Sequence, residues 1–124
     1  MKYLILIHSN PQSREIWESF SDEQRTEGYA YYAALNDELI ASGEMIVSEA
    51  LADPSLGQRL PAQAGSPVAS SDGPFAEVKE HLAGFFLVQC ESMARALEIA
   101  ARVPEADLGL VEVRPVLNLG GTEF

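Results

Sequence analysis

Asp72 is the residue of this sequence best suited to proton transfer. It lies in the stretch SDGPFAEVKEH (71–81), which places a sharp turn between two segments that read as buried strands. A carboxylate in a cleft, with a raised pKa, is suited to remove a proton from a carbon next to a carbonyl. Pro74 is a favoured first-turn residue, so Asp72 is equally suited to cap a short helix that starts there. Both roles remain open.

Tyr32 and Asn36 place polar atoms on a helix face that is otherwise apolar. They stand one helical turn apart and are suited to bind a substrate oxygen, or to satisfy each other and the sheet. Arg114 alternates with Val111 and Val113 and shares a face with Glu112. Its guanidinium group is suited to an anionic ligand or to an ion pair between subunits. We therefore expect Asp72 as the catalytic residue and Tyr32, Asn36 and Arg114 as substrate-binding residues.

The two histidines and the single cysteine suggest no further site. His8 ends an apolar segment and is expected to be a satisfied residue at the edge of the core. His81 stands four residues after Glu77 and is expected to be its solvated partner. No ligand spacing joins the histidines, so no metal or cofactor is expected. Cys90 excludes an internal disulfide and is expected to be a buried thiol.

The elements that position these residues follow from periodicity and capping. Apolar segments predict strands over 3–8, 44–51, 84–90 and 109–117. Ser21 and Gln24 have the spacing of a capping box, which predicts a helix to about Ser42, before Gly43. Ser92 predicts a second helix that ends before Pro104. One or two short strands within 58–71 and a short helix from Pro74 complete the expectation.

Two helical stripes are expected to face the sheet. On the first helix the stripe consists of Tyr29, Tyr32, Ala33, Asn36, Leu39 and Ile40. On the second helix it consists of Met93, Ala96, Leu97, Ala100 and Ala101.

The order of elements predicts one α+β domain over 1–124, a ferredoxin-like βαββαβ sandwich. The strands at 3–8 and 84–90 are apolar on both faces, whereas the helices of such a fold cover only one. We therefore expect a homodimer packed sheet to sheet.

Composition excludes several partners. The chain has 8 Lys and Arg against 19 Asp and Glu, and a formal net charge of −11, which would repel nucleic acid and anionic membrane surfaces. The longest apolar run, residues 3–7, is too short to cross a bilayer or to form a signal peptide. A soluble, cytoplasmic protein is expected.

The stretch DGPFAEVKEHLAGF, together with the ending VEVRPV at 111–116, resembles the YCII-related (DGPF-domain) family. This resemblance covers nearly the whole chain and implies a dimeric α+β barrel of ferredoxin-like protomers. Some relatives are isomerases or dehydrochlorinases of small ring compounds, and a His/Asp pair has been proposed as an active site in the wider family. Asp72 matches the aspartate of the motif. Tyr32 stands near the position of the proposed histidine, so the resemblance does not carry a histidine-dependent mechanism to this chain.

Two functions are therefore expected as alternatives. The first is a cofactor-independent enzyme of isomerase or lyase type that acts on a small organic molecule beside the DGPF loop. The second is a non-catalytic ligand-binding or regulatory homodimer in which Asp72 is structural.

Overall fold

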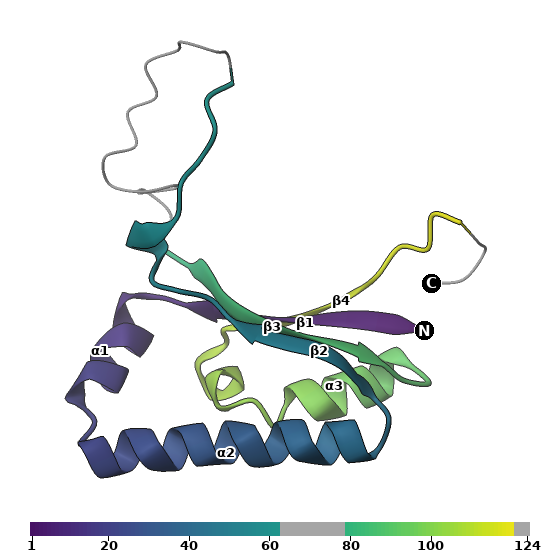
Figure 1. Ribbon diagram of the computed structural model, residues 1–124, viewed down its shortest axis with the longest axis horizontal. Helices are drawn as coiled ribbons and strands as arrows, with labels where there is room; N and C mark the ends of the chain where they lie inside the picture. Colours follow the sequence, from purple (N-terminus) through teal and green to yellow (C-terminus); the bar gives the residue numbers. More distant parts are fainter. Residues whose placement is uncertain (63–78, 121–124) are drawn as a thin grey trace.

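A four-stranded antiparallel sheet forms the centre of the molecule. The computed structural model describes residues 1–62 and 79–120. In these ranges the strands run in the order β2-β3-β1-β4, and every neighbouring pair is antiparallel (Figure 1). The strands are β1 (Lys2–Ser9), β2 (Met45–Ala50), β3 (His81–Gln89) and β4 (Val111–Pro115). This order is that of the expected ferredoxin-like α+β fold.

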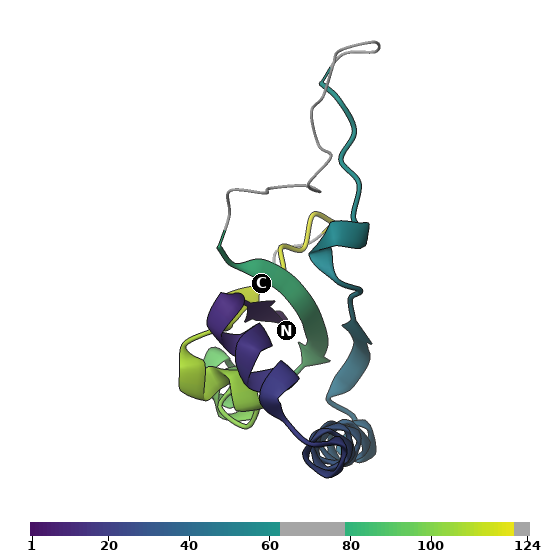
Figure 2. The same cartoon turned by 90° about the vertical axis from the view of Figure 1, so that its left-hand side faces the viewer.

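The described helices lie on one side of the sheet. They are α1 (Pro11–Ser19), α2 (Asp22–Ala41) and α3 (Met93–Ala100), with two short 3-10 helices, η1 (Pro54–Leu56) and η2 (Pro104–Leu108). In Figure 1 the three α-helices all run beneath the strands. The turned view looks along the axis of α2, which lies below the β2 side of the sheet (Figure 2). No described helix covers the opposite sheet face, which we call the open face.

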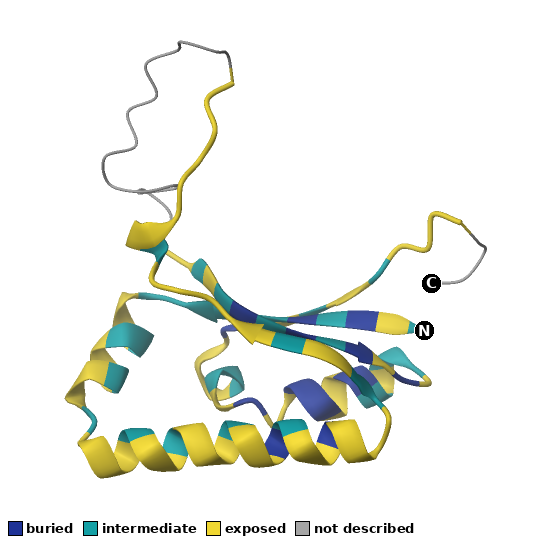
Figure 3. Ribbon diagram, in the orientation of Figure 1, coloured by how far each residue is buried: buried dark blue, intermediate teal, exposed yellow. Residues whose placement is uncertain are grey.

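Alternation along β1 separates the core from the open face. Tyr3, Ile5 and Ile7 are buried against the helices, whereas Leu4 and Leu6 are half-buried on the other side. The buried cluster also takes residues from β3, α2 and α3, as the dark blue segments of Figure 3 show. These residues include Phe86, Val88, Leu35, Leu39, Ala96 and Ile99. Among the described residues, no polar or charged residue is buried as a whole.

Helix α2 begins and ends where its capping residues predict. Ser21 and Gln24 form both hydrogen bonds of the capping box, and Gly43 adopts a φ of 82°, which favours glycine. The inward face differs from the expected stripe: Leu35 and Leu39 are buried, whereas Tyr29 and Ile40 are exposed. The first half of α2 packs against α1 and not against the sheet. Here the Tyr29 ring contacts the Trp17 ring edge-on, with ring centroids 5.3 Å apart.

Helix α1 was not expected from the sequence. Asn10 and Ser13 form a complete capping box, and Pro11 occupies the first turn. None of its residues is buried, so it adds no residue to the buried core.

Two further boundaries differ from expectation. Strand β3 starts at His81, so Leu82 belongs to a strand and not to the short helix expected from Pro74. On α3, Ile99 is buried and Leu97 is exposed, because the helix turns its Ala96, Ile99 and Ala100 face to the sheet. Residues 58–62 form no strand. The rest of the expected short elements lies outside the described residues.

Candidate functional site

Tyr32 lies on α2 and contacts both the sheet and η2. Its ring meets Phe86 of β3 edge-on, with centroids 6.4 Å apart, and its hydroxyl donates a hydrogen bond to Oε1 of Glu105 on η2. Burial, and then the hydrogen bond to the Glu105 carboxylate and its charge, raise the pKa of Tyr32 far above its ordinary value. The phenol is therefore a neutral donor at physiological pH, committed to Glu105.

Asn36 follows Tyr32 by one turn on the same helix. Its side-chain oxygen Oδ1 is buried and has no hydrogen-bond partner among the described residues. A buried carbonyl oxygen without a donor costs roughly 1–3 kcal/mol, so most such groups in proteins are paired. A buried acceptor without a partner calls for an explanation, and a ligand that donates to it is one. Tyr32, Asn36 and Glu105 are called here the α2–η2 site.

The four sequence-predicted residues are not all brought together. Tyr32 and Asn36 share the inner face of α2, as expected, but Tyr32 bonds to Glu105 and not to Asn36. Arg114 lies on the open face, where it donates two hydrogen bonds to Oε2 of Glu112, at 3.0 and 2.6 Å. Within one protomer the sheet separates Arg114 from the α2–η2 site. Asp72 and the DGPF motif lie outside the described residues.

Sequence reasoning missed Glu105. It follows Pro104 in a short polar segment that reads as solvated surface. The only local signal was the proline, which starts η2 but does not indicate where the next side chain points. Glu105 enters the site because η2 packs back towards α2, and this is a tertiary contact between positions 73 residues apart.

The histidines of this chain lie away from the α2–η2 site. His8 is on the open face, with Nε2 4.0 Å from Oε1 of Glu112. His81 is the first residue of β3, so the expected i+4 helical contact with Glu77 does not apply. Within 1–62 and 79–120, no group of three or more His, Cys, Asp and Glu side chains is arranged to hold a metal ion. Also within these ranges, no helix is both long and apolar enough to span a membrane.

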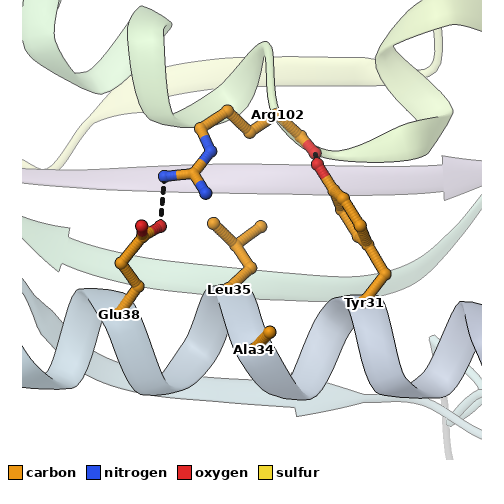
Figure 4. Close-up of a pocket in the computed structure, with 5 residues that line it drawn as sticks. All are labelled: Tyr31, Ala34, Leu35, Glu38 and Arg102. Carbon is orange, nitrogen blue, oxygen red and sulfur yellow. Dashed lines mark hydrogen bonds and ion pairs between the residues drawn. The ribbon is translucent and has the colours of Figure 1, made fainter.

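A hollow lies between α2 and the segment that links α3 to η2, and we call it the outer groove. It is a shallow groove of about 290 Å³ lined by Tyr31, Ala34, Leu35, Glu38 and Arg102 (Figure 4). Glu38 forms an ion pair with the Arg102 guanidinium group, and the Tyr31 hydroxyl donates to the Arg102 carbonyl at 2.6 Å. The one cation of the groove is therefore already neutralised.

The fold is that of the ferredoxin-like α+β proteins, in which a helix-covered antiparallel sheet carries the site. The model of the YCII-related domain matches residues 1–120, and the chain belongs to this family. An uncharacterized protein of Rhizobium meliloti (strain 1021) is 30% identical over 118 residues, which cover 94% of this chain and 92% of the relative.

A solved structure supports the same fold. It is 5-chloro-2-hydroxyhydroquinone dehydrochlorinase (TftG) from Burkholderia phenoliruptrix AC1100, in complex with 2,5-dihydroxybenzoquinone. The two chains superpose with a TM-score of 0.52 over 94% of each, at 18% sequence identity. At this identity the likeness concerns the fold alone.

Proposed function

We propose that this protein is a cofactor-independent enzyme of isomerase or lyase type that acts on a small organic molecule in the cytoplasm. The observation that carries the proposal is the buried, unpartnered Oδ1 of Asn36, one helical turn from the Tyr32 hydroxyl. A folded protein keeps such an acceptor at a cost in stability, and binding a ligand there offsets that cost. In this scheme Tyr32 and Asn36 position the substrate.

Asp72 is proposed as the base. The reaction class that suits a single carboxylate without a metal is removal of a proton from a carbon next to a carbonyl, followed by proton return or loss of a leaving group. Tyr32 is unsuited to be the base, because its proton is held by Glu105 and by burial. The structural neighbour is named for a chlorinated hydroxyhydroquinone, and ring compounds of this size are therefore the first to test.

The protein is also proposed to be a homodimer that joins through the open face. Leu4 and Leu87 are cross-strand partners there, as are Leu6 and Phe85, and all four are half-buried in the single chain. Arg114 and Glu112 flank this apolar surface and carry opposite charges. A face with apolar residues and both signs of charge is suited to pack on a copy of itself. Arg114 would then pair across the interface or hold an anionic group of the substrate.

The enzyme proposal is tested by isotope exchange. The purified protein is screened by thermal shift against small lactones, enol acids and halogenated phenols, and each stabilising compound is then incubated with protein in deuterated water. Deuterium should enter the compound, or its leaving group should be released, with wild type and far more slowly with Asp72→Asn. Removal of a catalytic carboxylate should slow this step by about 100-fold or more.

The alternative is a non-catalytic ligand-binding homodimer in which Asp72 only builds its loop. Its support is that the Tyr32 hydroxyl already has its hydrogen-bond partner within the chain, as a purely structural side chain would. Under this alternative the same compounds bind, no exchange is catalysed, and Asp72→Asn simply melts at a lower temperature.

A further inference from the structure

We propose that the α2–η2 site selects small neutral compounds that present hydroxyl or N–H donors and rejects carboxylates and phosphates, and that Glu105 sets this preference. This inference rests on one part of the proposed function, namely that a ligand binds between α2, η2 and the sheet. It requires no reaction there.

The first argument is the number of free acceptors. Tyr32 occupies Oε1 of Glu105, and no described residue donates to the other carboxylate oxygen, Oε2. Asn36 adds its buried Oδ1, also without a donor in the described part of the chain. A carboxylate oxygen and an amide oxygen both accept hydrogen bonds and cannot bind another acceptor. Two of the three side chains therefore present an acceptor that a ligand hydroxyl or N–H group can fill.

Few donors of the α2–η2 site can meet a ligand. The Tyr32 hydroxyl has a single proton, which is directed at Glu105, so the side-chain N–H₂ of Asn36 is the remaining donor of the three side chains, and it carries no charge. Arg102, which precedes η2, forms its ion pair with Glu38 on the outer groove. Among the described residues, no Lys or Arg forms an ion pair with Glu105. An anionic ligand would therefore meet a carboxylate without a neutralising cation.

The third argument is the cost of a wrong ligand. A site built from hydrogen-bonding groups strongly rejects an analogue that lacks the matching polar group, because the buried Asn36 oxygen then stays unpaired. An anion is rejected more strongly, because like charges repel at short range and the whole chain carries a net charge of −11. Donor number and ligand charge should thus decide affinity more than ring size does.

The experiment is a calorimetric titration of the wild-type protein at pH 7 with four compounds that share one ring. Resorcinol carries two hydroxyl donors, 3-methoxyphenol one, 1,3-dimethoxybenzene none, and benzoate is an anion. We expect affinity to fall by about 10-fold with each lost donor. Benzoate should not bind. Equal affinity for resorcinol and its dimethyl ether, tighter binding of benzoate, or no binding of resorcinol at millimolar concentration would overturn the inference.

Two variants assign the preference to Glu105. Glu105→Gln keeps the shape of the side chain and removes its charge. The variant should bind resorcinol more weakly than wild type does, and the difference between its affinities for resorcinol and for benzoate should be smaller. The matched control is Glu98→Gln, the same substitution at a position of α3 whose side chain is 69% exposed, which should leave both affinities unchanged. If Glu105→Gln changes neither affinity, or if Glu98→Gln has the larger effect, the assignment to Glu105 is wrong.

The outcomes separate this inference from the proposed function. Preference for donors without any catalysed exchange would support the inference and contradict the enzyme. Catalysed exchange that depends on Asp72, in a protein that binds benzoate as well as resorcinol, would support the enzyme and overturn the inference. The wild-type titration series decides the inference even if a variant fails to fold.

Discussion

The hydroxyl of Tyr32 donates its hydrogen bond to Glu105, which lies 73 residues further along the chain. This contact joins the middle of α2 to the short helix η2 directly before β4. Asn36, whose side-chain oxygen is buried, follows Tyr32 by one turn of α2. A positioned phenol, a carboxylate and an unsatisfied amide are thus gathered on the helix-covered side of the sheet, and they form the basis of the functional proposal.

Asn36→Leu should raise the stability of the free protein and abolish ligand binding. Leucine has nearly the same volume and removes a buried acceptor without a donor, so the free protein should be more stable by about 1 kcal/mol in denaturant unfolding. The same variant should lose the ligand-induced rise in melting temperature. Asp37→Leu, at the next, exposed position of α2, should leave ligand binding unchanged. A clear loss of stability in Asn36→Leu would show that the oxygen is structural.

Above pH 10.0, the free energy of unfolding should depend on the ionisation of Tyr32. The folded chain holds the Tyr32 proton at a pH where the unfolded chain, with a pKa near 10.0, has released it. The corresponding stability is complete below pH 10.0 and is lost as the pH rises above it. The free energy of unfolding should therefore decline less steeply in Tyr32→Phe, by up to about 1.4 kcal/mol per pH unit. Tyr29→Phe, at an exposed ring, should follow wild type; equal slopes in all three proteins would contradict the account.

The acid side should report on the ion pair between Glu44 and Arg95. Arg95 donates to both Glu44 oxygens at 2.8 Å, and chiefly through this contact lowers the pKa of Glu44 from 4.5 to about 2. The contribution of Glu44 to stability is present above pH 4.5 and is lost as the pH falls towards 2. Glu44→Gln should unfold with about 1 kcal/mol less free energy at neutral pH and converge with wild type in acid.

Glu98→Gln is the control for this ion pair. Glu98 contacts the same guanidinium group at 3.3 Å, but its side chain is 69% exposed. Solvent screening should make its removal nearly neutral at every pH. An effect as large as that of Glu44→Gln would mean that the charge of the region, and not the paired geometry, stabilises the protein.

Sedimentation should reveal the proposed homodimer. Wild type at micromolar concentration should sediment as a dimer, and Leu87→Asp, at the centre of the open face, should sediment as a folded monomer. Leu97→Asp places the same charge on an exposed position of α3 and should remain dimeric. A wild-type monomer would remove the dimer from the proposal, and with it the role of Arg114 across the interface.

The sequence predicted the parts of the fold that local signals specify. Ser21 with Gln24 marked the start of α2, Gly43 marked its end, and the alternation of Val111 and Val113 with charged residues marked β4. Helix α1 was not predicted, because its capping box pairs Asn10 with Ser13 and lacks the Glu or Gln by which such a box is recognised in a sequence. Tyr29 and Ile40 were placed inward because periodicity specifies a stripe but not the neighbour that a helix meets.

The candidate site was predictable only in part. Tyr32 and Asn36 were found because polar residues on an otherwise apolar stripe are unusual. Glu105 was not found, because its role depends on how η2 packs against α2. Strand alternation placed Arg114 and Glu112 on the same face of β4, and in the structure their side chains are hydrogen-bonded to each other.

The most direct test of the central claim is a proton–nitrogen NMR titration that follows the side-chain amide of Asn36. The titrant is the compound that stabilises the protein most in the thermal-shift screen. The account predicts that the Asn36 side-chain signals shift and saturate together with the backbone signals of Tyr32 and Glu105. Saturating shifts confined to the outer groove around Arg102, or to the open face around Arg114, with Asn36 unmoved, would contradict it.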